Sequence, residues 1–379
     1  MTGGISCRLC VNVLTGRHSM TSKERILAAL QNKPVDHIPF CPFLAYVWEH
    51  FPPEIQNRGQ LDFHHRIGAD PLWRGAPCPV YTTHPSELKY VSTDKDGRTE
   101  DEIITPKGTL RQAWARSESG NTSFLVEHLL KTEQDFKVQM WIEENTTMVY
   151  DPTHVNNHFA GDGREGLSLG MLIPRSKSAF QNLVEHLVGT EELAYALADF
   201  PDTVEALWRI MVARDLEAVK LAVKSPYSHF ITWEDSSTQN YSPSQYDAYI
   251  GSEIGQWCDI LTGSGKHYSQ HACGHVAALV GRMKAHGVHC VESISPPPTG
   301  NITIREARKT IGSSMGIIGG IEPIQFLALS EKQLKPYVES VIRDGAGGPF
   351  VLANSDSCPP GVSISKFELV ADIARNTKG

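Results

Sequence analysis

Residues 267–285, with the sequence HYSQHACGHVAALVGRMKA, decide the fold class, because a strand-like pattern passes directly into a helical one. Residues 267–273 have the length of a strand, and residues 276–285 carry apolar side chains at helical spacing. The same unit of a strand followed by a helix occurs five times between His229 and the C-terminus, at intervals of roughly 20 to 40 residues. The expected strands are 229–235, 267–273, 287–293, 316–321 and 349–355, and the expected helices are 243–261, 276–285, 304–311, 330–343 and 364–374.

Repeated strand–helix units imply a parallel sheet covered by helices, which leaves an open doubly wound sheet and a closed barrel as alternatives. No G-x-G-x-x-G turn follows an early strand, and 379 residues suit a barrel with an added segment. We therefore predict an α/β fold, a (β/α)8 TIM barrel with an elaborated N-terminal segment. Residues 37–43 are the expected first strand, residues 75–150 an excursion of strands and turns, and residues 191–223 a helical stretch broken at Pro201.

Residues 1–19 form a separate tail in this interpretation, and residues 20–379 form a single domain. Thr21 or Ser22 would cap a helix over residues 23–32. The tail contains basic residues and no acidic ones, so a targeting peptide and a loose tail from an upstream start both stay open. Its Cys7-x-x-Cys10 pair has no second pair to complete a metal site, and we leave it out of the predicted site.

Composition excludes several classes of function. The net charge of −8 argues against nucleic-acid binding, which needs a basic surface. No apolar run approaches the ~18 residues of a membrane span, so we expect no membrane partner. Eight scattered cysteines in a chain of this length do not form a disulfide scaffold, which indicates a reduced, cytoplasmic enzyme. The oligomeric state does not follow from the sequence.

Polar residues and glycines gather at the ends of the expected strands, where barrel enzymes carry their catalytic groups. They are Glu234, Asp235, His271, Cys273, Glu292, Gly319, Gly320, Asp356 and Cys358. His271 and Cys273 are two residues apart on one strand, so their side chains point the same way and can reach one metal ion. We predict a metal site of His271, Cys273 and Cys358, with Glu292 as an exchangeable fourth ligand.

The ligand types predict zinc, since two thiolates and an imidazole suit it better than magnesium or calcium. Three protein ligands with one open position are typical of catalytic zinc. We expect Glu234 and Asp235 to be catalytic groups, one of which orients the substrate or accepts the second N–H of His271. Glu292 could instead pair with an arginine such as Arg305 at the rim. Gly319, Gly320 and Asp356 are the expected cofactor contacts.

Three segments carry a resemblance to the uroporphyrinogen decarboxylase superfamily: TSKERILAALQNKPVDHIP at 21–39, QHACG at 270–274 and SMGIIGGIEP at 314–323. One branch of that superfamily consists of metal-free decarboxylases with an arginine-rich motif near the N-terminus. The matching stretch here, PFCPFLAYVW at 39–48, contains no arginine, which speaks against porphyrinogen decarboxylation. The other branch consists of cobalamin-dependent methyltransferases, whose coenzyme M type has a His-x-Cys…Cys zinc site that His271, Cys273 and Cys358 match.

The resemblance implies a zinc-dependent methyltransferase that moves a methyl group between a small substrate and a corrinoid (cobalamin). The substrate is a thiol acceptor or a methyl donor such as a methoxy compound, for which aromatic and histidine side chains between Tyr46 and Trp73 could line a pocket. The chain has no corrinoid-binding Asp-x-His-x-x-Gly segment, so cobalamin would arrive on a partner protein. The direction of transfer stays open. So do a metal-free decarboxylase, with Asp235 or Asp356 as its acid, and a non-catalytic corrinoid- or metal-binding accessory protein.

Overall fold

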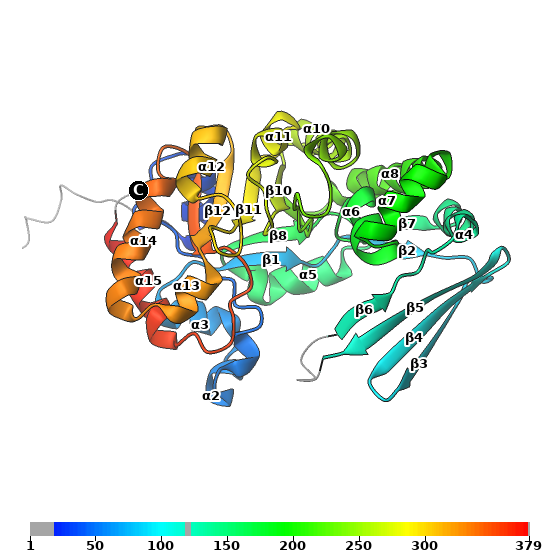
Figure 1. The fold of residues 1–379 in the computed structure, drawn as a ribbon. Coiled ribbons are helices and arrows are strands. Elements are labelled where there is room, and N and C mark those ends of the chain that lie inside the picture. Colours follow the sequence, from blue (N-terminus) through cyan, green and yellow to red (C-terminus); the bar gives the residue numbers. More distant parts are fainter. Residues whose placement is uncertain (1–18, 118–122, 378–379) are drawn as a thin grey trace, which may run out of the picture.

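Seven parallel strands form one curled sheet in the computed structural model, which describes residues 19–117 and 123–377 (Figure 1). Their order is β1-β8-β9-β10-β11-β12-β13. The bounds are Leu72–Ala76, Leu167–Met171, His229–Thr232, His267–His271, Cys290–Ile294, Gly316–Ile321 and Phe350–Asn354. Nearly all of the tail expected at residues 1–19, with Cys7 and Cys10, lies outside the described residues.

Residues 39–41 fill the eighth position and close the sheet into a barrel. On one side the Cys41 N–H donates to the Leu352 carbonyl of β13 at 2.8 Å, and the Leu352 N–H donates to the Pro39 carbonyl at 3.1 Å. On the other side the Asp70 N–H donates to the Phe40 carbonyl at 2.8 Å, just before β1 begins. The first strand expected at 37–43 is therefore reduced to a single bridge, because Pro39 and Pro42 have no N–H to donate to a ladder.

Helices cover the outside of the barrel and confirm the five repeated units. In this half they are α9 Pro243–Gln245, η4 Tyr246–Gly251, α10 Ser252–Gly263, α11 Val280–Ala285, α12 Ile304–Ile311, α13 Pro323–Ala328, α14 Glu331–Gly345 and α15 Ile364–Asn376. The helix expected at 304–311 matches α12, whereas α11 begins four residues later than expected and α13 was missed. The expected break at Pro201 is confirmed, since α7 Thr190–Asp199 ends just before α8 Pro201–Ala222.

The N-terminal elaboration contains two small antiparallel sheets. Strands β2 Val80–Thr83 and β7 Thr147–Tyr150 pair with each other. Strands β3 Lys89–Lys95, β4 Arg98–Thr105, β5 Gly108–Arg116 and β6 Ser123–Glu127 form a sheet that projects from the barrel (Figure 1). These sheets confirm the strands and turns expected within 75–150, but helix α4 Glu133–Glu144 in the same stretch was not expected. The remaining helices are α1 Ser22–Leu30, η1 Trp48–His50, α2 Pro53–Gln56, α3 Gly59–Ile67, α4 Glu133–Glu144, α5 Thr153–Ala160, η2 Asp162–Arg164, α6 Ala179–Asn182 and η3 Leu183–Leu187.

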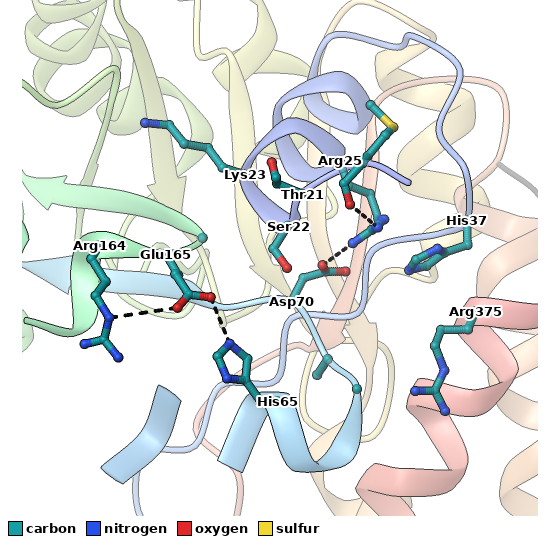
Figure 2. A pocket seen from close by; sticks show the side chains of 14 residues that line it. Thr21, Ser22, Lys23, Arg25, His37, His65, Asp70, Arg164, Glu165 and Arg375 are labelled. Carbon is teal, nitrogen blue, oxygen red and sulfur yellow. Dashed lines mark hydrogen bonds and ion pairs between the residues drawn. The ribbon is translucent and has the colours of Figure 1, made fainter. Parts of the chain in front are cut away.

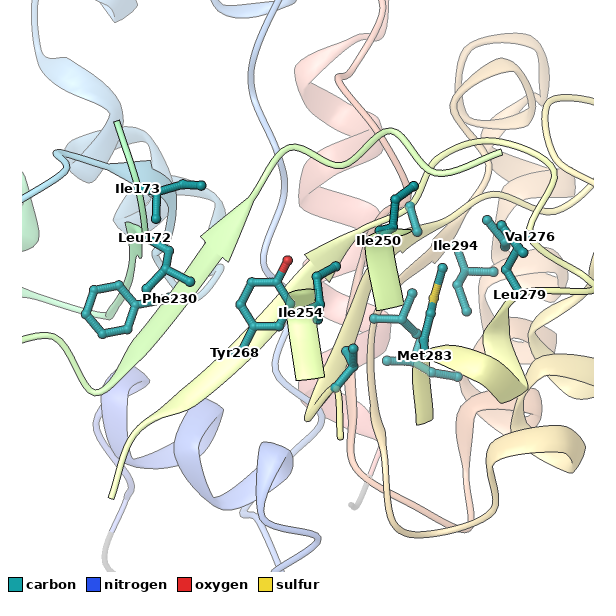
Figure 3. Close-up of a cluster of buried hydrophobic side chains, with 14 of the residues drawn as sticks. Leu172, Ile173, Phe230, Ile250, Ile254, Tyr268, Val276, Leu279, Met283 and Ile294 are labelled. Atoms are coloured by element: carbon teal, nitrogen blue, oxygen red, sulfur yellow. The ribbon is translucent and has the colours of Figure 1, made fainter. Parts of the chain in front are cut away.

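The hydrophobic core lies between the barrel strands and the outer helices. Figure 3 shows Phe230 of β9 near Leu172 and Tyr268 of β10 near Ile254 of α10, with Met283 of α11 further along the same cluster, all fully buried. Strands β8, β9, β11, β12 and β13 are buried at every position, as expected for parallel strands covered on both faces. Among the described helices, none combines the length and apolar character that crossing a bilayer requires. The frame is rigid enough to hold side chains at the strand ends.

Candidate metal centre

The loops after the strands enclose a cavity of about 370 Å³ at the carboxyl end of the barrel. It is lined by Phe43, Ser176, Lys177, His186, Trp233, Asp235, His271, Asp356 and Ser357. Three residues predicted from the sequence, Asp235, His271 and Asp356, therefore share one cavity. Its position agrees with the rule that barrel enzymes carry their sites at this end.

Asp235, His271 and Cys273 bring three potential metal ligands together. One ligand atom from each lies within 4.8 Å of the others. Asp235 Oδ1 is 3.3 Å from His271 Nε2 and 3.5 Å from Cys273 Sγ. Asp235 has a φ of 42°, a strained backbone conformation of the kind that collects at functional sites. Nitrogen, sulfur and oxygen donors at this spacing fit zinc.

Gly274 explains how Cys273 reaches Asp235, although the two follow different strands. A Cβ atom at Gly274 would lie 2.5 Å from Ser237 Cβ and 2.8 Å from the Ser236 carbonyl oxygen. Only glycine allows the loop after β10 to lie this close to the loop after β9. The glycine that ends the His-Ala-Cys-Gly segment is therefore part of the site's construction.

Glu292 holds the far side of the His271 ring. Its Oε2 is 2.5 Å from His271 Nδ1, and its Oε1 is 2.9 Å from Arg74 Nε of β1. A carboxylate at Nδ1 fixes the tautomer and directs Nε2 toward Asp235. Glu292 lies outside the trio of clustered ligand atoms, and its role as an exchangeable ligand stays a prediction. The alternative that Glu292 pairs with an arginine is confirmed, but the arginine is Arg74 and not Arg305, which pairs with Asp344 at 2.8 Å.

The electrostatic environment of the site favours a positive charge beside the carboxylates of Asp235 and Glu292. Burial lowers the pKa of His271, but the charge of Glu292 and hydrogen bonds with Asp235, Cys273 and Glu292 together raise it well above its usual value. Burial raises the pKa of Asp235, yet the hydrogen bond and charge of His271, together with Lys177, lower it to about 2. Burial raises the pKa of the Cys273 thiol. A divalent cation would satisfy the same pair of carboxylates and deprotonate that thiol.

Glu234 does not face the three clustered ligands, although it adjoins Asp235. It is fully buried, and it accepts hydrogen bonds from the Ser178 N–H at 2.8 Å, the Ser178 hydroxyl at 2.7 Å and the Thr232 hydroxyl at 2.7 Å. Burial raises its pKa to about 7. In this arrangement Glu234 ties the loop after β8 to β9. Of the two acids expected to orient the substrate or bond to His271, Asp235 contacts the ring at Nε2, whereas the acceptor at Nδ1 is Glu292.

Cys358 directly follows two residues that line the cavity, but it is not itself in the lining and does not belong to the cluster of ligand atoms. Asp356 and Ser357 line the cavity, whereas Cys358 is fully buried in the hydrophobic core and forms a bridge with Tyr46. Burial raises the pKa of its thiol well above the usual range, and burial also raises the pKa of Asp356. Cys358 is not part of the cluster of ligand atoms, so its role as a ligand stays a prediction.

Gly319 and Gly320 serve close packing in the observed arrangement. Their φ angles of 143° and 108° favour glycine, and a Cβ at Gly320 would lie 2.5 Å from Val341 Cγ1. The Gly320 N–H donates to the Ser355 hydroxyl at 2.8 Å. Neither glycine lines the 370 Å³ cavity, and their contact with a cofactor stays a prediction.

Six residues of the cavity lining are absent from the predicted site: Phe43, Ser176, Lys177, His186, Trp233 and Ser357. Phe43 and Trp233 stack with ring centroids 6.0 Å apart, and Trp233 meets the His271 ring edge-on at 5.1 Å. Lys177 and His186 come from the segment after β8, where we expected no strand. The signal for Trp233 was its place between Thr232 and Glu234 at a strand end. Trp48 and Trp73 pack elsewhere, against Phe63 and His64 respectively, so they do not form the aromatic pocket considered above.

A larger cavity of about 620 Å³ lies at the opposite end of the barrel, beside the start of α1 (Figure 2). Most of its charged groups are paired within the chain. Arg25 contacts Asp36 and Asp70 at 2.6 and 2.5 Å, and Glu165 contacts His65 at 2.9 Å. Figure 2 shows the Glu165 and Asp70 carboxylates in its centre, with the unpaired Lys23 ammonium pointing away. This cavity is therefore the weaker candidate for a site.

The sequence model of the uroporphyrinogen decarboxylase (URO-D) family matches residues 181–377, slightly more than half of the chain. Among curated proteins the sequence has no match. Among solved structures, a methyltransferase from Methanosarcina mazei has a TM-score of 0.60 and 13% identity, covering 94% of this chain and 98% of its own. A B12-independent methionine synthase from Shewanella sp. W3-18-1 has a TM-score of 0.42 and 7% identity, covering 89% and 97%. The similarity to the first of these structures covers nearly the whole chain, so the two proteins share the fold over that length.

Proposed function

Since the chain belongs to the uroporphyrinogen decarboxylase (URO-D) family, we propose that it is a zinc-dependent methyltransferase within that family. It moves a methyl group between a small substrate, a thiol acceptor or a methoxy-type donor, and a corrinoid carried by a partner protein. The observation that carries the proposal is the cluster of Asp235, His271 and Cys273 beside a cavity of about 370 Å³. The imidazole and the thiolate are typical zinc donors, and their presence beside Asp235 favours a metal site over a metal-free acid–base site.

In this proposal His271, Cys273 and Asp235 hold the zinc ion, and Cys358 is the further donor that the resemblance implies. Bound zinc would supply either deprotonation of a thiol substrate or Lewis acidity toward a methyl donor. Glu292 and Arg74 keep the His271 ring oriented, so that Nε2 faces the metal. Phe43 and Trp233 give the cavity an apolar wall against which a methyl-bearing substrate excludes water.

Charge at the cavity disfavours the decarboxylase alternative. A substrate with several carboxylates needs unpaired cations, and Arg74 is fully buried and paired with Glu292. Lys177, which does line the cavity, already contacts the carboxylates of Glu185 and Asp235. The other basic groups in the lining are His186 and His271, and His271 already contacts the carboxylates of Asp235 and Glu292. These contacts leave little capacity to bind a polycarboxylate.

The test combines metal analysis with turnover. Purified protein is assayed for zinc per chain, and the cobalamin spectrum is followed with methylcobalamin plus a panel of thiols, and with cob(I)alamin plus a panel of methoxy compounds. About one zinc per chain and a change in cobalt methylation support the proposal. Zinc without turnover, even with added corrinoid protein, favours the accessory protein. Folded protein that takes up no zinc refutes the zinc-dependent mechanism.

A further inference from the structure

Lys177 is a buried cation that contacts two carboxylates at the mouth of the barrel. It lies between β8 and α6, and its side chain is 5% exposed. Its Nζ contacts Glu185 Oε2 and lies 3.1 Å from Asp235 Oδ2. We propose that Lys177, anchored by Glu185, is a positioning residue that presents Asp235 to the metal through a single oxygen. This inference rests on the proposed function, because it concerns the same metal site.

The two oxygens of Asp235 have different neighbours. Oδ1 faces the other donors, 3.3 Å from His271 Nε2 and 3.5 Å from Cys273 Sγ. Oδ2 points to the Lys177 ammonium. A charge-assisted hydrogen bond to one oxygen holds the carboxylate plane and occupies the lone pairs that a second metal bond would need. Asp235 therefore binds through Oδ1 alone, and its second oxygen does not compete with the substrate for the metal.

Glu185 fixes Lys177 because the helix after α6 widens into a π-turn. Residues Leu183–Leu187 form the π-helical turn η3. Such turns are rare in proteins overall, but those that occur often lie at functional sites. Within this turn the Glu185 carboxylate accepts from Lys177 Nζ and from Gln181 Nε2. The next residue, His186, lines the cavity. Without Glu185, the buried Lys177 ammonium would have only the Asp235 carboxylate as a partner, and the metal would compete for that carboxylate. Lys177 would then not keep its position, because a buried charge needs a partner.

The contacts form a row of alternating charge across the barrel mouth. Arg74, Glu292, His271, Asp235, Lys177 and Glu185 follow one another, each in contact with the next. Arg74 and Lys177 occupy equivalent places, because each holds a carboxylate whose other oxygen contacts His271. The row fixes both sides of the imidazole, because Asp235 follows β9 and Glu292 lies on β11, the two strands that flank β10, and this is the preorganisation that a metal site requires.

The experiment uses cobalt(II) in place of zinc, since its visible spectrum reports coordination number. In Lys177→Met the freed Oδ2 adds a fifth ligand, so the d–d bands weaken while one metal per chain is kept. Ethanethiol, titrated as a simple thiol probe, binds about tenfold more weakly than in the wild type. Lys177→Arg, which keeps the charge, restores the wild-type spectrum. The matched control is Lys266→Met, because Lys266 bonds backbone carbonyls at the other end of the barrel.

Two results overturn the inference while leaving the proposed function intact: a Lys177→Met spectrum and thiol affinity like those of Lys266→Met, or complete loss of metal from folded Lys177→Met. If Lys177→Met does not fold, Asp235→Asn tests the same assignment. An amide is a poor ligand, so cobalt affinity should fall at least about tenfold, and unchanged affinity overturns the inference. Wild-type protein that takes up no metal overturns the proposed function, and this inference with it.

Discussion

Replacing Glu292 by glutamine should destabilise the barrel and weaken its metal site at the same time. The Glu292 and Arg74 side chains are both 0% exposed, with 2.9 Å between Oε1 and Nε. Glutamine keeps the shape of the side chain but removes its charge, which leaves the Arg74 guanidinium buried without a counterion. Breaking such a pair costs about 3–5 kcal/mol of unfolding free energy. The neutral amide also accepts less strongly from His271 Nδ1, and zinc affinity should fall about 10- to 100-fold.

Urea denaturation followed by circular dichroism measures the first effect, and competition with a zinc-binding dye measures the second. The matched control is the double variant Glu292→Met with Arg74→Met, because replacing a whole buried pair by apolar groups is far milder than breaking it. The double variant should recover stability but not zinc affinity, since His271 still lacks its acceptor. A Glu292→Gln protein within about 1 kcal/mol of the wild type, with unchanged zinc affinity, would falsify this reasoning.

Three further predictions concern the ligands, the loop contact and acid stability. Metal analysis of Cys273→Ala should show that most bound zinc is lost, while the circular dichroism spectrum stays that of the wild type. Cys358→Ala should behave in the same way if Cys358 is a ligand. Full zinc occupancy in Cys358→Ala would remove Cys358 from the site. Gly274→Ala should lose about 1–3 kcal/mol in urea denaturation and bind zinc more weakly, because its Cβ clashes with Ser237; wild-type values would contradict the close approach. Burial and neighbouring histidines lower the pKa of His229 to about 3 and of His289 to about 4. Their contribution is therefore present above the unfolded pKa near ~6.5 and lost as pH falls toward 4. Urea midpoints should drop over that window, and less so in His229→Phe; equal losses in both proteins would contradict the assignment.

Sequence patterns predicted the repeated half of the barrel, because each unit is encoded locally. The helix at 304–311 has its own cap and its own apolar spacing, and it forms where expected. The first strand was less predictable, since Phe40 bonds to β13 across more than 300 residues of chain and its neighbouring prolines hide the strand pattern. The π-turns η3 and η4 leave no periodicity by which they could be recognised.

Of the three clustered donors, His271 and Cys273 were predicted as ligands and Asp235 as a catalytic group, while the other two predicted ligands, Cys358 and Glu292, lie outside the cluster. His271 and Cys273 follow from alternation along one strand, and Asp235 from its place at a strand end. Glu234, one residue earlier, faces elsewhere because both acids follow the end of β9 at Thr232 and the backbone turns at Asp235, whose φ is 42°. Arg74 and Lys177 could not be found in the same way, because their partners Glu292 and Asp235 come from strands distant in sequence. Such ion pairs depend on how the strands are arranged in the folded barrel, which local sequence patterns do not encode.

The seam at Phe43 and Asn354 means that the mouth of the barrel can form only after β13 has been synthesised. There the Asn354 side chain bonds both backbone groups of Phe43, with its Oδ1 accepting at 2.8 Å and its Nδ2 donating at 2.9 Å. Contacts of such high sequence separation form slowly, and β13 is translated after every other strand. A nascent chain can build the helices that precede β13 and most of its sheet on the ribosome, but the cavity wall formed by Phe43, Asp356 and Ser357 must wait for β13 to pair with residues 39–43. Any loss of β13 would leave a nearly complete barrel with an open side, exposed strand edges and no site.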